Sequence, residues 1–421
     1  MLYYLFEYLD KQFNLPGAGL VHYITFRAAA GIILALVVSM IFGNRIIRSL
    51  KKMQIGETVR DLGLEGQKAK EGTPTMGGLI IFLAVMVPTL LFTKVLNVYI
   101  ILMIVTTVWM TGIGFLDDYI KVVNKKKAGL RPRFKIIGQV GLGLIVGITM
   151  LFHSQILVRM PLEMAQQNGY EIVKTFKTEV SAVNEAKTVQ EMAYVKSTLT
   201  NLPFVKGNEF NYAFFLDIVG IDAKDWIWLI FIPAIVFIIT LVSNATNLTD
   251  GLDGLTSGLS AIVGATLGVM AYVSSNTIIA DYLNILYLPF SEELVVFSAI
   301  FLGAMVGFLW HNSYPAKVFM GDTGSLAIGG IIATLAILLR KELLIPILCG
   351  VFLAEALSVV IQVSYFKYTK KKFGVGKRVF LMTPLHHHFQ KLNMNESKIV
   401  TRFWIVGIML AVITIITLKV R

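Results

Sequence analysis

The sequence predicts an all-α polytopic membrane protein, and three observations support this fold class. The 421 residues are 56% hydrophobic and only 15% charged, whereas a soluble globular protein is about 45–50% apolar and about 25% charged. The mean hydropathy is +0.71. The apolar residues gather in ten runs, each long enough to cross about 30 Å of hydrocarbon as a helix. This composition excludes an ordinary water-soluble enzyme.

The ten apolar runs predict about ten transmembrane helices, with both chain termini on the same side of the membrane. They cover 22–43, 76–94, 98–116, 135–153, 226–243, 256–274, 293–310, 324–340, 343–366 and 402–418. Residues 1–13 are aromatic-rich and amphipathic, which is typical of a segment lying along the interface or of an aromatic belt before a span. The single cysteine, Cys349, lies in an apolar run, so no internal disulfide is expected.

Basic residues in the linkers predict the orientation. The linkers on one side carry 23 lysines and arginines and those on the other side carry 13, of which seven lie in the long stretch 154–225. Long loops carry little weight in the positive-inside rule, so the 23-residue side is expected to be cytoplasmic and both termini outside. This topology accounts for the net charge of +12, and we expect no nucleic-acid partner.

The stretch 154–225 is the only sizeable polar segment. We predict one integral-membrane domain over 1–421, with an extracytoplasmic insertion at about 154–225. The composition leaves open whether this insertion is a small folded domain or a flexible loop. It has no glycine-rich or metal-spaced motif, so we expect no part in the chemistry.

The first polar cluster is the pair Asp117 and Asp118 at the predicted end of the third span. Adjacent carboxylates repel each other at an apolar boundary, and a cation would relieve that repulsion. Magnesium suits such a site because it is typically bound by one or two carboxylates together with substrate phosphates. The alternative is a solvated helix end with Lys121 nearby.

Two further clusters lie in linkers on the same side. Residues 244–255 contain Asn247, Asp250 and Asp253 and no basic residue, which favours a ligand-binding loop or simply a tight turn. Asp322 opens a later span within G-D-T-G-S. Backbone donors and the helix dipole there favour phosphate, and Asp322 would complete a magnesium site or cap the helix.

Histidines and lysines complete the candidate residues on this side. His386, His387 and His388 are consecutive, and side chains on a loop diverge, which disfavours a three-histidine zinc site. A phosphate-binding or acid–base role is predicted instead, with a plain surface loop as the alternative. Lys70 and Lys135 lie nearest the apolar boundaries and are the candidates for contacting substrate phosphate.

These clusters predict phosphoryl transfer between a soluble phosphorylated donor and an acceptor embedded in the membrane. The competing class is a transporter with a polar ion pathway. All clusters lie on one predicted side, and no polar cluster interrupts the middle of a span. Both observations disfavour transport, because transporters place their sites near the bilayer midplane.

Five motifs occur in the order typical of one family: T-P-T-M-G-G, F-L-D-D-Y, N-A-T-N-L-T-D-G-L-D-G-L, P-A-K-V-F-M-G-D-T-G-S and P-L-H-H-H-F. The sequence resembles the phospho-N-acetylmuramoyl-pentapeptide-transferases, within the polyprenyl-phosphate N-acetylhexosamine-1-phosphate transferases. The resemblance covers about residue 20 to 421 apart from 154–225, which is far longer than the outer loop expected for the family. It implies ten transmembrane helices in the bacterial inner (plasma) membrane, with the active site on the cytoplasmic face.

The resemblance also implies the reaction. UDP-N-acetylmuramoyl-pentapeptide and undecaprenyl phosphate, a membrane lipid, would give lipid I and UMP in peptidoglycan biosynthesis, with Mg²⁺ as cofactor. Asp117 would deprotonate the acceptor or form a covalent intermediate. A phosphate monoester has a second pKa of about 6, so much of the acceptor is already a dianion, and a positioning role for Asp117 stays open. Oligomeric state also stays open, with a homodimer to be tested.

Site residues follow from the resemblance, position by position. Catalytic roles are implied for Asp117, Asp118, Asp322, His386, His387 and His388, with Asp118 and Asp322 as metal ligands. Substrate binding is implied for Lys70, Thr75, Lys121, Lys135, Asn247, Asp250, Asp253, Asn312, Phe319 and Gln362.

Overall fold

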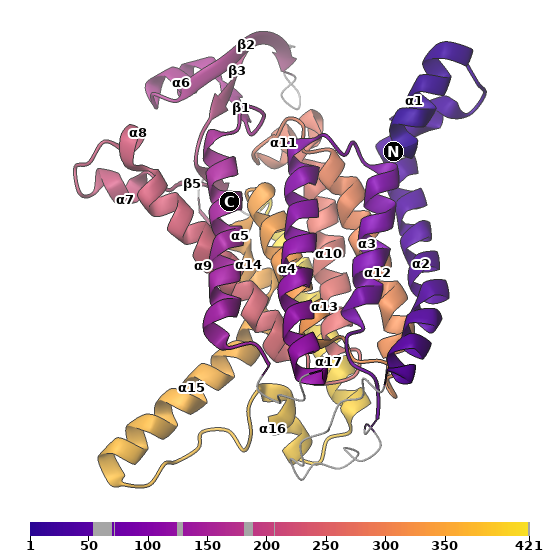
Figure 1. The fold of residues 1–421 in the computed structure, drawn as a ribbon. Helices are drawn as coiled ribbons and strands as arrows, with labels where there is room; N and C mark the ends of the chain where they lie inside the picture. Colours follow the sequence, from indigo (N-terminus) through magenta and orange to yellow (C-terminus); the bar gives the residue numbers. More distant parts are fainter. Residues whose placement is uncertain (54–69, 71, 124–128, 181–187, 206, 420–421) are drawn as a thin grey trace.

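The computed structural model describes residues 1–53, 70, 72–123, 129–180, 188–205 and 207–419. Long helices lie side by side in one bundle, with the strands gathered at one end and α16 at the other (Figure 1). We call these the strand end and the site end. The described residues contain nine helices long and apolar enough to span a membrane. The predicted all-α polytopic fold is confirmed.

The bounds of the nine helices follow the predicted runs in order. They are α2 (Ile24–Lys52), α4 (Val98–Val123), α5 (Pro132–Phe152), α9 (Trp228–Thr249), α10 (Leu255–Ser274), α12 (Glu293–Asn312), α13 (Gly321–Leu338), α15 (Gly350–Phe373) and α17 (Glu396–Ile416). The run at 76–94 forms α3 (Gly78–Phe92), which is apolar but has only 15 residues.

Helix α13 is the centre of the bundle, since 89% of its span is buried. It packs on α4, α9 and α3. A Cβ at Gly114 of α4 would lie 2.1 Å from the backbone oxygen of Asp322, and one at Gly78 would lie 2.1 Å from the Gly324 nitrogen. Only glycine allows backbones to approach this closely, and this contact brings the C-terminal part of α4 to the start of α13.

Several predicted helix ends are wrong, and the largest difference is at α2, which continues to Lys52, nine residues beyond the predicted 43. Helix α4 continues to Val123 and α9 continues to Thr249, because polar residues end a hydropathy window without breaking a helix. The run at 343–366 is not one helix. It divides into η3 (Glu342–Leu344), α14 (Ile345–Leu348) and then α15, which runs seven residues beyond its predicted end and away from the bundle (Figure 1).

Both termini lie at the strand end (Figure 1). The N-terminal segment forms α1 (Leu2–Phe13) and η1 (Ala18–His22), and the Tyr3 ring packs 5.0 Å from the Arg27 guanidinium. Arg27 in turn makes a buried bidentate pair with Glu293, at 2.6 and 2.7 Å. Near the other terminus, Lys419 Nζ donates to the Tyr282 carbonyl at 2.8 Å, beside α11 (Thr277–Leu283).

The insertion is folded, which decides between the two predicted alternatives. Strands β1 (Val158–Pro161), β3 (Thr188–Lys196) and β2 (Glu171–Val180) form an antiparallel sheet in that order, and β4 (Leu199–Asn201) pairs with β5 (Glu209–Asn211). Short helices α6 (Leu162–Gln167), α7 (Phe214–Asp217) and α8 (Ala223–Trp226) complete it. Its small core includes Leu286 and Leu288 from the segment between α11 and α12, so the insertion packs onto the bundle.

Candidate functional site

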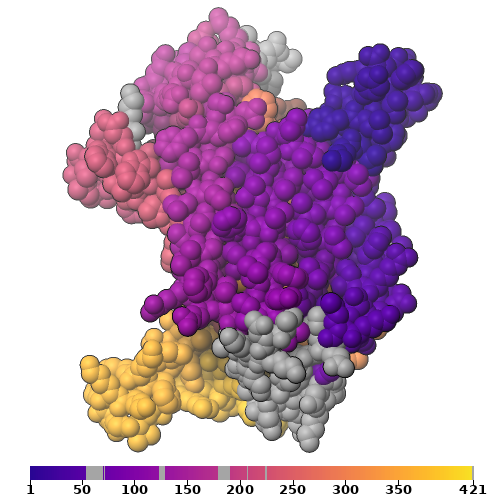
Figure 2. Space-filling model, in the orientation of Figure 1, coloured from indigo at the N-terminus to yellow at the C-terminus, as the bar shows by residue number. Residues whose placement is uncertain are grey.

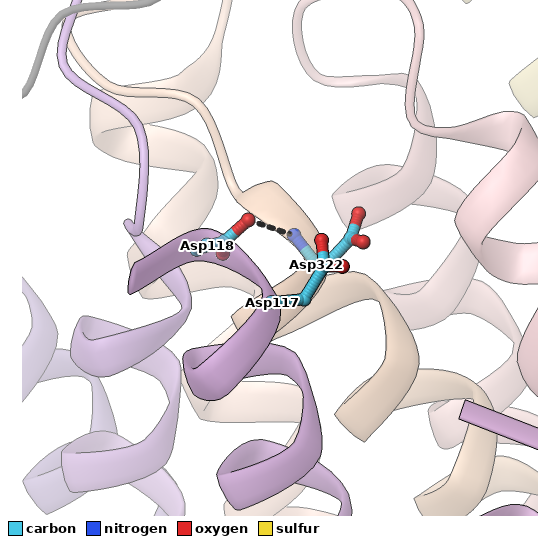
Figure 3. Close-up of side chains that lie close together, drawn as sticks. All are labelled: Asp117, Asp118 and Asp322. Atoms are coloured by element: carbon cyan, nitrogen blue, oxygen red, sulfur yellow. Dashed lines mark hydrogen bonds between the residues drawn. The ribbon is translucent and has the colours of Figure 1, made fainter. Parts of the chain in front are cut away.

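Three aspartates meet at the site end, two from α4 and one from α13. Asp117 and Asp118 lie inside α4, not at its end as predicted, and Asp322 is the second residue of α13. One carboxylate oxygen of each lies within 4.8 Å of the others. Figure 3 shows the side chains of Asp117 and Asp322 close together, with Asp118 reaching the Asp322 backbone. The sequence prediction that these three converge is confirmed.

Asp118 caps the N-terminus of α13. Its carboxylate accepts the N–H of Asp322 at 3.2 Å, and the N–H and hydroxyl of Thr323 at 2.8 and 2.6 Å. The N-cap residue, Met320, makes no side-chain cap. The predicted capping role of Asp322 is therefore wrong, because Asp322 lies within the first turn. The N–H groups at the start of α13 are predicted to bind phosphate. In the structure, two of them, from Asp322 and Thr323, already donate to Asp118 of α4.

Two lysines close the acidic cluster. Lys121 Nζ lies 2.5 Å from Asp117 and 3.2 Å from Asp322, and Lys135 Nζ of α5 lies 2.9 Å from Asp117 and 2.5 Å from Asp322. Asp117 is fully buried, so the predicted alternative of a solvated helix end is wrong. The lysine side chains are 36% and 20% exposed. The five charged side chains have a net charge of −1. The partly exposed lysines give this cluster access to solvent on one side.

Asn247 and Thr75 border this cluster. Asn247, in the last turn of α9, donates from Nδ2 to Asp322 at 2.9 Å and to the Ser325 hydroxyl at 2.8 Å. Thr75 lies beside Gly321, where an added Cβ would meet Thr75 Oγ1 at 3.0 Å and Asp118 Oδ2 at 2.5 Å. Gly321 also has φ +70, so both space and backbone favour glycine there.

A second charged group surrounds Lys70. Its Nζ lies 2.7 Å from Asp253 and 2.6 Å from Glu396, and it stands 5.9 Å from the centre of the Phe319 ring. Burial opposes the ammonium charge, but Glu396 and Asp253 together outweigh it and raise the pKa of Lys70. Asp250 is half-buried at the end of α9, where its N–H donates to the Asn247 carbonyl at 3.3 Å.

Asn312 lies beneath this second group. Its Oδ1 accepts the N–H of Gly254 at 3.1 Å and the hydroxyl of Ser257 at 3.0 Å, and its Nδ2 donates to the Val318 carbonyl at 3.0 Å. The side chain is 3% exposed. In this arrangement Asn312 joins two loops, which suits a positioning residue better than a direct ligand contact.

The three histidines lie in the first turn of the short helix α16 (Leu385–Lys391), so the surface-loop alternative is wrong. The predicted divergence of the side chains is wrong for the first two, because the ring centres of His386 and His387 lie 4.2 Å apart. His386 is fully buried, with Nδ1 3.2 Å from a carboxylate oxygen of Glu355, and its N–H donates to the same carboxylate. The His387 ring pairs with Gln390 at 2.7 Å, and burial, with His386 beside it, lowers the pKa of His387 to about 4. His388 Nδ1 accepts the Leu381 N–H at 3.2 Å.

Gln362 belongs to a separate part of this end. Its Oε1 accepts the N–H groups of Val379 and Phe380 at 2.9 and 3.0 Å, which ties α15 to the segment before α16. A pocket of about 510 Å³ lies beside it. Its walls are apolar and basic, with Val363, Phe366, Leu381, Lys367, Arg378 and Lys391 among the lining residues.

Sequence reasoning missed Glu355 and Glu396. Glu355 is fully buried in α15 and holds His386, and Glu396 accepts from both Lys70 and the Asp253 N–H at 2.8 Å. A lone glutamate inside an apolar run is a signal for Glu355, since ionisable residues at membrane depth are costly. Glu396 begins α17 among ordinary surface residues and carries no such signal.

Known proteins match this chain along its whole length. Residues 70–82 match a phospho-N-acetylmuramoyl-pentapeptide-transferase signature, and residues 193–340 match the model of glycosyl transferase family 4. Proteins named phospho-N-acetylmuramoyl-pentapeptide-transferase are 59%, 56% and 53% identical in Flavobacterium psychrophilum, Flavobacterium johnsoniae and Parabacteroides distasonis, over 100% of both chains. The insertion therefore falls inside the aligned region. The chain belongs to the phospho-N-acetylmuramoyl-pentapeptide-transferase family.

Proposed function

We propose that the protein transfers phospho-N-acetylmuramoyl-pentapeptide from its UDP-linked donor to undecaprenyl phosphate, giving lipid I and UMP. The observation that carries the proposal is the convergence of three carboxylates and two lysines where α4, α5 and α13 meet. Family membership names the reaction. The described residues contain nine helices long and apolar enough to span a membrane, which supports an acceptor that is itself in the bilayer. The protein thus acts as a multi-pass enzyme of the bacterial inner membrane.

The cofactor we propose is Mg²⁺, bound by Asp118 and Asp322 with Asp117 beside them. The donors are all carboxylate oxygens within 4.8 Å of one another, which fits a hard divalent cation. The five charges total −1, so a divalent cation raises the total to +1 and favours a diphosphate. When bound, the ion would offset negative charge on the diphosphate during transfer.

The lysines and Asp117 take different roles in this proposal. Lys121 and Lys135 exchange contacts with Asp322 for contacts with donor phosphate oxygens. The acceptor phosphate oxygen bonds to the β-phosphorus, and the bond from that phosphorus to the bridging oxygen breaks, so the oxygen and its electron pair leave with UMP. Both oxygens of Asp117 are held by Lys121, Lys135 and the Leu130 N–H. This arrangement supports positioning over proton abstraction or covalent attack.

The remaining candidates line the approach to this centre. Lys70, Asp253 and Phe319 form a charged and aromatic corner suited to the nucleotide. Asn312 joins its loops, and Asp250 lies at the end of α9 in the same polar segment as Asp253. Gln362 and the neighbouring pocket of about 510 Å³ offer apolar and basic walls. Such walls suit the phosphate end of a polyprenyl chain or the donor. The charge of Lys70 acts on His387, and His388 Nδ1 accepts the N–H of Leu381, one of the residues that line the pocket.

UMP release tests the activity directly. Purified protein should release UMP from UDP-N-acetylmuramoyl-pentapeptide only when polyprenyl phosphate and Mg²⁺ are both present, and a chelator should stop it. Equal turnover of UDP-N-acetylglucosamine would contradict the substrate. Flux of the donor into liposomes without UMP release would instead support a transporter.

We propose that the site end faces the cytoplasm, as the linker charges predict. Single cysteines at Gln190 in β3 and Lys391 in α16, with Cys349 replaced, lie at opposite ends of the bundle. An impermeant thiol reagent added to intact cells should label position 190 and spare 391 until the cells are opened. Labelling of 391 from outside would overturn this orientation.

A further inference from the structure

A run of large apolar side chains is exposed on one flank of the insertion. Its members, here called the apolar flank, lie on α7, α8, the segment between them and the start of α9, which contact one another in that order: Phe214, Phe215, Ile218, Val219, Ile221, Trp226 and Trp228. Val219 is 69% exposed and Ile218 is 67% exposed. A contiguous exposed patch of this kind marks a surface that contacts a membrane or a protein.

A tight turn in the backbone after Leu216 is the reason that these residues are exposed. Helix α7 is a single turn, and the N–H groups of Val219 and Ile221 both donate to the Leu216 carbonyl at 3.0 Å. This closed turn buries Leu216 and directs Ile218 and Val219 outward. Phe214 and Phe215 pack edge-on against Phe210 at 6.3 and 5.8 Å, so the outward rings have fixed neighbours. The inner side of the turn already has its own apolar contacts.

The apolar flank continues into the outer surface of a membrane span. Trp226 stacks on Trp228, the first residue of α9, with ring centres 6.3 Å apart. Farther along α9, Phe237 is 64% exposed. Tryptophans at the end of a span are typical of the membrane–water interface. Helices α7 and α8 lie beside the start of α9 in Figure 1, and the same lobe projects sideways from the bundle in Figure 2.

The opposite part of the insertion is richer in charge, although Ile172 and Val173 are also exposed there. The β2–β3 ribbon exposes charged side chains, including Lys174, and forms the exposed ion pair between Lys177 and Glu191 at 3.2 Å. The insertion therefore has a water-exposed ribbon and a separate apolar flank at the level where α9 begins.

We propose that the apolar flank inserts into the headgroup–acyl boundary of the leaflet on the strand end, and that its partner is lipid. Continuity with the exposed face of α9 favours lipid over a protein partner, since a bilayer that surrounds α9 reaches the flank without any further component. The insertion is then held at two places, by its packing on the bundle and by the membrane. This inference does not depend on the proposed catalytic function.

Spin labels on the full-length protein in phosphatidylcholine–phosphatidylglycerol nanodiscs test the proposal. Single cysteines replace Val219, Phe237 or Lys174, with Cys349 replaced, and each carries a nitroxide. Collision with oxygen, which enters lipid, is compared with collision with a water-soluble nickel chelate. We expect the oxygen-to-nickel ratio to be highest at Phe237, intermediate at Val219 and several-fold lower at Lys174.

Two outcomes would overturn the proposal. A ratio at Val219 equal to that at Lys174 would mean that the flank faces water. Low collision with both reagents at Val219 would mean that protein, such as a second copy of this chain, covers it. All three positions are exposed on the surface, so the substitutions leave the core unchanged.

Discussion

Helix α13 separates two groups of buried charges that differ in arrangement. Asp322 at its first turn meets Asp117, Asp118 and two lysines. Just beyond its last turn, the consecutive residues Arg340, Lys341 and Glu342 are each no more than 2% exposed. One helix thus carries a charged cluster at each end of the bundle.

At the strand end, each charge has a different partner, and the insertion supplies them. Arg340 donates to the Ser197 carbonyl at 3.0 Å, Lys341 to the side chain of Asn201, and Glu342 accepts the Tyr212 hydroxyl at 3.2 Å. These contacts join β4, the segment before it and the segment after β5 to the end of α13. These contacts attach the insertion to the bundle.

The comparison shows that burial of charge alone does not mark chemistry. At the site end like charges converge, with carboxylate oxygens within 4.8 Å of one another, and Lys121 stays 36% exposed. At the strand end the charges diverge and are closed to solvent. Gathering like charges is unfavourable for packing, so convergence together with an opening to solvent is the stronger indicator of a binding site.

Removing one site-end carboxylate charge should give the largest effect. Asp118→Asn and Asp322→Asn keep the side-chain shape but replace one acceptor oxygen by an NH2 group and remove the charge. Each should lower UMP release on the order of 10³-fold because the developing charge loses its stabilisation. Higher Mg²⁺ or Mn²⁺ should recover part of the loss. Asp117→Asn should lose turnover that extra metal does not recover. Near-parental turnover of Asp322→Asn would exclude the shared metal site.

The corresponding substitution at the strand end should lower the stability of the protein and leave its turnover unchanged. Glu342→Gln removes the anion that faces Arg340 and Lys341 and leaves the Tyr212 hydroxyl with a neutral acceptor, and losing a hydrogen bond to a charged group costs about 1.5–3 kcal/mol. The thermal midpoint in detergent should fall, while UMP release per folded molecule stays near the parental value. Arg340→Met combined with Glu342→Met should recover part of the midpoint. A loss of turnover without a loss of stability would place this cluster in the chemistry.

Glu355 tests whether the histidine helix belongs to the site-end group. Glu355→Gln keeps the shape but removes the anion 3.2 Å from His386 Nδ1, and a hydrogen bond to a charged group, such as that from the backbone N–H of His386 to this carboxylate, contributes about 1.5–3 kcal/mol. Turnover should fall roughly tenfold to a hundredfold, because α16 and the loop at Gly251 rest on this ring. Glu355→Asp should recover part of the turnover. The ¹⁵N shifts of His386 should change in the Gln variant, and unchanged shifts with unchanged turnover would remove Glu355 from any positioning role.

The sequence predicted the membrane fold and the meeting of Asp117, Asp118 and Asp322, because hydropathy and acidic residues at span boundaries are local signals. It did not predict which carboxylate caps α13. That outcome depends on the close approach at Gly114, which no single segment encodes. The division of the ninth run, in contrast, has a local signal, because Pro346 lies in the first turn of α14. The partners of Glu396 come from residues 326 and 143 positions away in the chain.

Lys341 gives a prediction on the pH dependence of stability, with no effect on chemistry expected. Complete burial, opposed by Glu342 and Glu209, lowers the pKa of Lys341 to about 7. The unfolded chain keeps this proton to about pH 10.5, so between about pH 7 and 10 the unfolded state binds more protons and the free energy of unfolding rises with pH. Well below pH 7 the Lys341 ammonium is charged in both states, and the cost of burying it lowers the free energy of unfolding by its full amount.

The check is the thermal midpoint in detergent at pH 7 and pH 9.5 for the parent and for Lys341→Met. Methionine has a similar length and no charge, so the variant should lack this part of the rise. Taking the difference between the two proteins cancels the titration of groups that they share. If both midpoints shift in parallel, Lys341 is uncharged at neutral pH or charged throughout. The strand end would then differ from the site end in the placement of its charges but not in their protonation.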